Sequence, residues 1–255
     1  MNKALKTVYT IAFLFILYLP MAILVTNSFN SSAYGITWEG FSIKWYQKAL
    51  ESFTLMEALK NSLILAFTSA LCTSVIATIS AFSFYKYKYI GRKVIYFFLQ
   101  VIIILPDIVM GIGLLFLFIL FKIELGYFTL LISHIALSLP FATITIFIGF
   151  KGLDKNILEA GKDLGASDYQ IFLKIIFPII LPNIISAYLI AFTLSLDDVL
   201  VSYFVSGPNY EILPLVIYSL ARLGIKPEVN ALCTLMLLLS IFFIVLSQAL
   251  IRKKL

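Results

Sequence analysis

Three aspartates stand in stretches of the chain that are otherwise almost entirely apolar. Asp107 lies within residues 94–121, and Asp197 and Asp198 lie within 183–205; neither stretch contains a Lys or an Arg. A carboxylate at membrane depth is costly even on the most lenient insertion scale, so it usually faces a cavity or a partner. The three residues therefore indicate a pathway that attracts cations, the cap of a broken helix or a pairing between subunits.

The composition places these carboxylates in a membrane. Of the 255 residues, 62% are hydrophobic and only 13% are charged, and the mean hydropathy is +1.04, far outside what a soluble core needs. A membrane span requires about 20 apolar residues with few charges. Six stretches qualify: 7–27, 61–84, 94–121, 128–150, 183–205 and 229–251. We predict an all-α, polytopic membrane protein with a single transmembrane domain.

The distribution of basic residues predicts the orientation of these spans. Six spans place both termini on one side, and most of the 19 Lys and Arg residues fall on that side. By the positive-inside rule this side is the cytoplasm. The net charge of +6 then reflects topology and lipid contact, and no nucleic-acid partner is expected. Cys72 and Cys233 form no CxxC pair, so we expect no metal site.

The segment 151–182, between the fourth and fifth spans, has the pattern of two short helices joined by a turn. Asp154 is placed to cap a first helix that runs to about Leu164, and Gly165 is placed to end it. On this helix the apolar side is formed by Ile157 and Leu158, with Gly161 and Leu164 as further candidates. The residues expected to face outward are Glu159, Lys162, Asp163 and Asp168.

The second short helix begins with a capping-box pattern, Ser167 followed by Gln170. Its apolar stripe consists of Ile171, Phe172, Ile175 and Ile176. Pro178 is expected to close this helix, and Pro182 to lie in the first turn of the fifth span. Such a compact element suits docking into a groove of another protein, whereas a solvated connector is the alternative.

The same segment resembles the coupling loop of ABC importer permeases. The family pattern E-A-A-x3-G-x9-I-x-L-P is met here with Gly161 in place of the second Ala and Phe177 in place of Leu. The residues that the resemblance assigns to coupling are Glu159, Ala160, Gly161, Asp163, Gly165, Ala166, Ile175 and Pro178. In that family the loop seats in a cleft of a separate ATPase subunit. The chain has no G-x-x-x-x-G-K-[ST] motif, so ATP and Mg would be used by that partner and no cofactor bound by this chain.

Further segments along nearly the whole chain resemble polyamine permeases among the type I ABC importers. They are TNSFNSS, GITWEGFSIKWY, LPDIVM, SHIALSLPF, KDLGAS, FTLSLDDVLVSYFVSGPNYEILPL and PEVNAL. The resemblance implies a six-helix, MetI-like fold in a bacterial inner membrane and import of spermidine or putrescine. It also implies a sister permease subunit, ATPase subunits and an extracytoplasmic polyamine-binding protein. A related permease for another small solute is the alternative.

Polyamines are flexible polycations, so their pathway should present carboxylates and aromatic faces. At 1.5 Å per residue, Asp107, which follows the kink-former Pro106, and Asp197 would each lie roughly 20 Å from the cytoplasmic start of their span. Asp197 and Asp198 are about 100° apart on a helix, so only one can point at a central pathway. The pathway residues predicted in this way, or by the resemblance, are Asp107, Asp197, Asp198, Ser195, Trp45, Tyr210 and Glu211. Ser195 or Thr193 could instead bond its own helix backbone, and Trp45 could be an interfacial anchor.

His134 is the single histidine, and it lies in the fourth span. A lone intramembrane histidine is more often an interhelical hydrogen bonder than a ligand. With Ser133 or Ser138 it could begin a hydrolase site, but neither G-x-S-x-G nor H-E-x-x-H is present, so catalysis is not expected. A channel or ion-driven carrier could use the same aspartates, yet neither class explains the segment 151–182.

Overall fold

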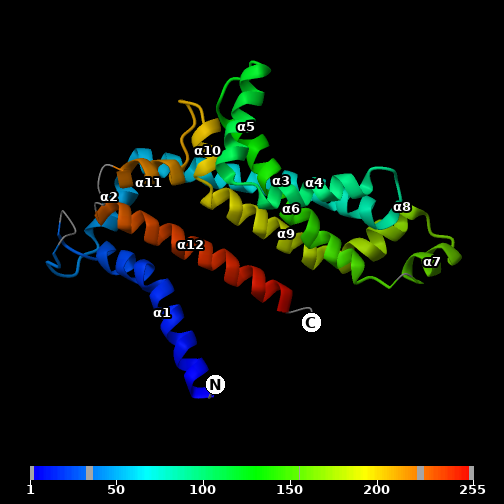
Figure 1. Ribbon diagram of the computed structural model, residues 1–255, viewed down its shortest axis with the longest axis horizontal. Helices are drawn as coiled ribbons and strands as arrows, with labels where there is room; N and C mark the ends of the chain where they lie inside the picture. Colours follow the sequence, from blue (N-terminus) through cyan, green and yellow to red (C-terminus); the bar gives the residue numbers. More distant parts are fainter. Residues whose placement is uncertain (1–2, 33–36, 155, 223–226, 253–255) are drawn as a thin grey trace. The chain divides into compact units, whose positions relative to one another are not determined.

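The computed structural model describes residues 3–32, 37–154, 156–222 and 227–252, which are almost entirely helical and contain no β-strand within these ranges (Figure 1). The chain divides into two compact units. Unit 1 combines Met1–Leu59 with Leu215–Ile241, and unit 2 combines Lys60–Pro214 with Phe242–Leu255.

Unit 1 contains α1 (Lys3–Ser28) and α2 (Lys44–Glu51). The segment between them is organised by Asn30, whose side-chain oxygen accepts hydrogen bonds from the backbone N–H groups of Ser32 (3.1 Å) and Glu39 (3.0 Å). Its amide donates to the carbonyl of Thr37 at 2.7 Å. None of the apolar window of α1, Thr7–Ser28, is buried within the chain.

Helix α3 (Phe53–Lys86) begins in unit 1 and continues in unit 2 from Lys60 onward. Unit 2 is built on this part of α3, on α6 (Tyr127–Lys151) and on α9 (Phe177–Asp197), with α6 and α9 packed against each other (Figure 1). The two helices approach closely at Gly149 of α6, because a Cβ at this position would lie 2.6 Å from the side chain of Asn183 in α9. Small residues permit such close approach of membrane helices. The fully buried members of the shared core include Ala77, Ala81, Phe150, Ile146 and Ile180.

The third predicted span, 94–121, is wrong as a single helix. It consists of α4 (Arg92–Ile104) and α5 (Asp107–Leu120), which are bent by 115° at the break between them. Pro106 has no N–H to continue the helix, and the residue before a proline is driven toward extended geometry; Leu105 indeed has φ −65° and ψ 131°. The kink that the sequence predicted at Pro106 is therefore confirmed, but it is a full break.

The expectation that Pro178 closes a separate helix is also wrong. The chain continues from α8 (Asp168–Ile171) through a π-helix (Phe172–Ile176) directly into α9. The N–H of Phe177 donates to the carbonyl of Phe172, five residues back. This wider turn directly before Pro178 relieves the ring clash that a proline causes inside an α-helix.

The fifth span, predicted over 183–205, begins earlier and ends earlier. Helix α9 ends at Asp197, and a separate short helix, α10 (Leu200–Val205), follows. The aspartates expected inside a span therefore lie at a helix end. The remaining helices are α11 (Leu213–Arg222) and α12 (Pro227–Arg252).

Within the described residues, four helices are long and apolar enough to cross a membrane: α1, α3, α6 and the continuous helix Asp168–Asp197. The bent pair α4–α5 makes a fifth candidate, and α12 contributes a shorter apolar helix over Pro227–Phe243. Each of these six elements overlaps one of the six predicted spans, although not all bounds agree, so the polytopic all-α fold is confirmed and the count of six is approximate.

Candidate functional site: the α7–α8 segment and the buried polar cluster

The first helix of the segment 151–182, α7 (Asn156–Asp163), has the predicted ends. Asp154 caps its start, since its carboxylate accepts the N–H of Asn156 at 3.0 Å. At its end the N–H of Gly165 donates to the carbonyl of Lys162 (2.8 Å) and that of Ala166 to Gly161 (3.1 Å). With Gly165 at φ +77°, this pair of bonds is a Schellman motif. The prediction that Gly165 ends the first helix is confirmed.

The second helix starts at the predicted capping box. The hydroxyl of Ser167 accepts the N–H of Gln170 at 3.3 Å, and the Gln170 side chain accepts the N–H of Ser167 at 3.0 Å. Reciprocal bonds of this kind satisfy two of the donors that a helix start leaves open. The turn between α7 and α8 is therefore supported by hydrogen bonds among residues that are close in the sequence.

Gly161 is where α7 meets the second helix. A Cβ on Gly161 would lie 2.9 Å from Cγ1 of Ile171 and 3.7 Å from Cδ1 of Ile175. A separation below 3.0 Å requires a shift of one partner, so the Gly that replaces the second Ala of the family pattern permits a closer helix contact here. Ile175 is half-buried, and Ile171 is only 1% exposed.

The second helix is anchored to α3 and α6. Ile171 and Ile176 belong to the buried core cluster together with Phe84 and Phe147. The ring of Phe172 packs on that of Phe82 with a centroid separation of 4.8 Å. At the rim, Lys86 donates to the carboxylate of Asp168 at 2.7 Å. A displacement of this segment would therefore act directly on the ends of two long helices.

The outward face of the segment carries the predicted charges, because Glu159, Lys162, Asp163 and Asp168 are all exposed. Leu164 was a candidate for the apolar side, but it is 88% exposed, since it lies at the turn where the helix has ended. Tyr169, which was not singled out in the sequence, is 72% exposed at the start of the second helix. Pro178 is exposed; the side chains of Ile157, Leu158 and Ala160 lie outside the described part.

A second polar cluster lies deep in unit 2 and is centred on His134 of α6. Its Nδ1 is 2.6 Å from the hydroxyl of Ser195, and its Nε2 is 2.9 Å from that of Ser202. The hydroxyl of Ser69 donates to Ser195 at 3.1 Å. His134 thus links α3, α6, α9 and α10, and its prediction as an interhelical hydrogen bonder is confirmed.

Asp198 completes this cluster. Its carboxylate accepts the N–H (2.8 Å) and the hydroxyl (2.7 Å) of Ser202 and lies 3.6 Å from Nε2 of His134. Only 8% of Asp198 is exposed. It therefore caps the start of α10 and faces the interior of this chain, while the adjacent Asp197 is exposed. Thr193 donates to the carbonyl of Leu189 at 2.9 Å, as the backbone alternative predicted.

Asp107 is the first residue of α5 and is exposed. Within the described residues its carboxylate forms no hydrogen bond or ion pair, although a carboxylate is favourable in the first turn of a helix. Helix α5 packs against α10 at Gly111, where a Cβ would lie 2.8 Å from the ring of Phe204. Asp107 and Asp197 are thus both exposed at the surface of this chain.

Tyr210 and Glu211, two of the predicted pathway residues, connect the segment before α11 to α3 through hydrogen bonds. The hydroxyl of Tyr210 donates to the carbonyl of Asn61 (2.9 Å), and the Asn61 amide donates to the carbonyl of Glu211 (3.0 Å). Burial, with a smaller contribution from the charge of Tyr127, raises the pKa of Tyr210 to about 12, so this hydroxyl stays protonated and remains a donor. The side chain of Glu211 is exposed.

Trp45 lies at the start of α2 in unit 1 and is only 5% exposed. Its indole N–H donates to the carbonyl of Asn30 at 2.7 Å, and the ammonium groups of Lys44 and Lys48 lie within 4.8 Å of the centre of its ring. Trp45 therefore packs inside unit 1. Its roles at a pore mouth or as an interfacial anchor remain predictions.

Comparison with known proteins identifies the class. A chain of a bacterial ABC transporter that imports the acidic polysaccharide alginate aligns with a TM-score of 0.75 at 16% identity, covering 98% of this chain and 94% of that one. A chain of the MetNI methionine ABC transporter aligns with a TM-score of 0.65 at 17% identity, covering 79% and 98%. At such identities the likeness shows the fold alone, which is that of an ABC importer permease.

Sequence relatives narrow the class to a family. Residues 73–255 match the family described as binding-protein-dependent transport system inner membrane component. The chain belongs to this family and is a transport component, not an enzyme. It is 46% identical over 246 residues to the spermidine/putrescine transport system permease protein PotC of Haemophilus influenzae, covering 95% of this chain and 96% of that protein.

Two relatives from Escherichia coli strain K12 show the same trend. Its PotC is 47% identical over 238 residues, covering 93% of this chain and 90% of that protein. Its putrescine transport system permease protein PotI is 36% identical over 228 residues, covering 87% and 81%.

Proposed function

We propose that this chain is the permease subunit of an ATP-driven importer that carries spermidine, putrescine or both into the bacterial cytoplasm. The observation that carries the proposal is the identity of 46–47% with two PotC permeases over 93–95% of the chain. The identity with PotI, a putrescine permease, is lower at 36%. The names of both PotC proteins include spermidine and putrescine. We therefore favour these two polyamines as the substrates.

The exposed carboxylates Asp107 and Asp197 support a polycationic substrate. Both lie where a long helix is interrupted, which is where membrane transporters commonly place groups that contact substrate. Asp198 supports them indirectly, because it caps α10 and so holds the chain in its turn directly after Asp197. We assign the first contact with an ammonium group to Asp107 and Asp197 and a positioning role to Asp198 and Ser195.

The α7–α8 segment supports coupling to a separate ATPase. It presents exposed charges and two exposed apolar residues, Leu164 and Tyr169, while Ile171 ties it to the core of unit 2. Docking of an ATPase on this face would transmit a displacement to α3 and α6. In this proposal ATP and Mg are bound by that partner.

The proposed assembly contains a PotB-like sister permease, PotA-like ATPase subunits and a PotD-like extracytoplasmic binding protein. The chain would lie in the inner membrane with both termini in the cytoplasm, on the side of α7 and α8. The basic residues at that end of unit 2 favour this orientation by the positive-inside rule.

Reconstitution tests the proposal. The chain is incorporated into liposomes with its three kinds of partner, and uptake of radiolabelled spermidine is measured with ATP inside and the loaded binding protein outside. We expect saturable, ATP-dependent uptake that unlabelled putrescine reduces. ATP-driven uptake of a sugar, amino acid or anion without uptake of either polyamine would reject the substrate assignment while retaining the transporter.

A further inference from the structure

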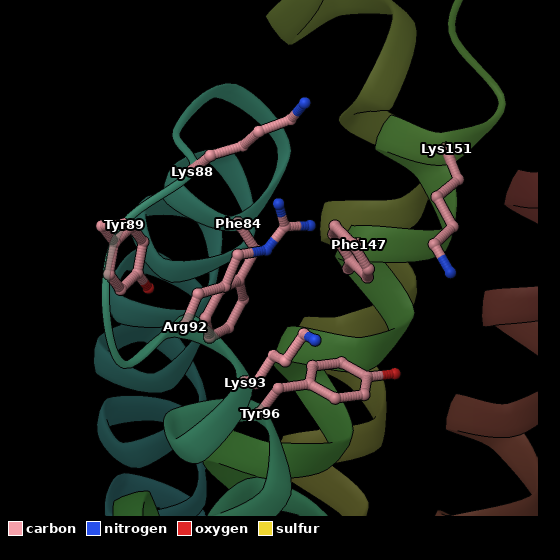
Figure 2. A pocket seen from close by; sticks show the side chains of 8 residues that line it. All are labelled: Phe84, Lys88, Tyr89, Arg92, Lys93, Tyr96, Phe147 and Lys151. Carbon is pink, nitrogen blue, oxygen red and sulfur yellow. The ribbon is translucent and has the colours of Figure 1, made fainter.

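A basic pocket opens between the end of α3, the start of α4 and the end of α6. Its volume is about 560 Å³, and Figure 2 shows the side chains that line it. They are Phe84, Lys88, Tyr89, Arg92, Lys93, Tyr96, Phe147 and Lys151. Because Lys151 is the last residue of α6, the pocket lies at the end of unit 2 from which the α7–α8 segment leaves.

The walls of the pocket are aromatic and preformed. The ring of Phe84 contacts those of Tyr96 and Phe147, each at a centroid distance of 6.1 Å, and Tyr96 contacts Phe147 at 6.1 Å as well. Phe84 and Phe147 are buried. Rings that pack on one another in this way hold the shape of the pocket without a ligand.

Four positive charges line this apolar frame. The guanidinium of Arg92 points across the pocket toward Phe147 (Figure 2), and the ammonium of Lys151 lies 4.9 Å from the centre of the Phe147 ring. In the described part of the chain, no carboxylate forms an ion pair with Lys88, Arg92, Lys93 or Lys151. The nearby Lys86, in contrast, is paired with Asp168. The residues that the structure describes thus provide a counter-ion for Lys86 but none for the four basic residues of the pocket. Their charge can be neutralised by an anion that is not part of this chain.

The surroundings of the pocket indicate what that counter-ion is attached to. On α4 the exposed side chains of Ile95 and Phe97 follow Arg92 and Lys93 by three and four residues, so they border the helix face that lines the pocket, and the exposed Val94 and Phe98 extend this apolar surface around the helix. A molecule with an anionic group in the pocket could therefore extend along an apolar helix face. This combination matches a phospholipid, whose phosphate needs cationic donors and whose acyl chains need an apolar surface.

We infer that the basic pocket binds the phosphate headgroup of an anionic phospholipid, with the acyl chains along α4. The planar guanidinium of Arg92 can donate two parallel hydrogen bonds to two phosphate oxygens. The flexible lysine side chains add positive charge around the phosphate. Basic pockets between membrane helices on the cytoplasmic side recognise anionic headgroups through this chemistry. The site is independent of the polyamine pathway, because four positive charges repel a polycation.

The test compares binding of phosphatidylglycerol and phosphatidylcholine to the purified full chain, by native mass spectrometry of lipid titrations. We expect the wild-type chain to prefer phosphatidylglycerol. Each basic residue near an anionic surface contributes enough that its removal weakens binding roughly five-fold. The double variant Arg92→Gln/Lys93→Gln should therefore lose about 25-fold in affinity for phosphatidylglycerol and nothing for phosphatidylcholine.

Two further variants make the result specific. Lys88→Gln/Lys151→Gln alters other sides of the same pocket and should produce a similar loss. The matched control Lys60→Gln/Lys122→Gln removes two exposed charges outside the pocket and should leave the preference unchanged. Equal losses in the control and pocket variants would mean that total charge, not this pocket, selects the lipid, and would overturn the inference.

Two further measurements distinguish a phospholipid in the pocket from a soluble anion and from a protein partner. Glycerol 1-phosphate carries the headgroup phosphate without acyl chains, so it should compete only weakly; competition as strong as that of the lipid itself would assign the site to a soluble anion. If the pocket variants bind phosphatidylglycerol normally but no longer retain the ATPase subunit, the pocket is a protein contact and the lipid assignment is wrong.

Discussion

Nε2 of His134 lies 3.6 Å from the carboxylate of Asp198 and 2.9 Å from the hydroxyl of Ser202, which itself donates to that carboxylate. The three side chains come from α6, from the end of α9 and from α10. A buried polar group with all partners in place is inexpensive, whereas one that loses a partner is costly. The turn after Asp197 is therefore held by a closed set of hydrogen bonds.

His134→Leu should destabilise this turn. It removes one hydrogen-bond partner from each of the buried hydroxyls of Ser195 and Ser202, so we expect a loss of about 1–3 kcal/mol and a lower midpoint in thermal unfolding of the detergent-purified chain. The control is Ser133→Ala, also buried in α6, because among the described residues the Ser133 hydroxyl bonds only the carbonyl of Thr129 in its own helix, at 2.7 Å. Equal midpoints for the two variants would show that the link between helices adds no stability.

The features predicted correctly from the sequence are those decided by nearby residues. The Gly165 turn, the Asp154 cap and the capping box of Ser167 each depend on a few consecutive side chains. Apolar stretches located the long helices for the same reason, since hydropathy is a local sum. The break at Pro106 was also predicted as a kink, because a proline acts on its own helix, but its angle of 115° was not.

The features that were missed depend on distant residues or on backbone detail. Hydropathy does not register that a π-helical turn carries the chain through Pro178, or that α9 ends at Asp197. The basic pocket was missed because Phe84, Arg92 and Lys151 are separated in the chain and meet only when α3, α4 and α6 pack. Their charges were counted as a sign of topology, which gave no hint that they share a pocket.

Gly165→Val should abolish transport while the complex still inserts. Its φ of +77° lies in the left-handed region, which costs an ordinary residue roughly 1–2 kcal/mol, and a β-branched side chain is stiffer still. Gly165→Asn is the matched control, because Asn adopts this conformation more readily, and it should retain most of the uptake. The measurement is ATP-driven uptake beside the amount of assembled complex; equal uptake by both variants would contradict a role for the turn.

Glu159→Lys should uncouple the permease from its ATPase. The residue is exposed on α7, so the change reverses one charge on the proposed docking face without disturbing the core. We expect uptake and co-purification of the ATPase to fall together, with a smaller effect for Glu159→Gln. Normal co-purification and normal uptake by the Lys variant would remove Glu159 from the docking face.

The last prediction separates the exposed aspartates from the buried one. Asp107→Asn and Asp197→Asn should each reduce polyamine uptake while the complex assembles and keeps its basal ATPase activity, because an amide preserves shape but not the attraction to an ammonium group. Asp198→Asn should act differently. Its carboxylate accepts two bonds from Ser202, so we expect a lower thermal midpoint together with any loss of uptake.

The double variant Asp107→Asn/Asp197→Asn decides between a pathway and a structural role. If the two carboxylates guide a polycation, uptake by the double variant should be lower than by either single variant, and spermidine, with more positive charge, should lose more than putrescine. Unchanged uptake of both polyamines would defeat the pathway hypothesis. A failure to assemble would instead assign the two aspartates to contacts with the sister subunit.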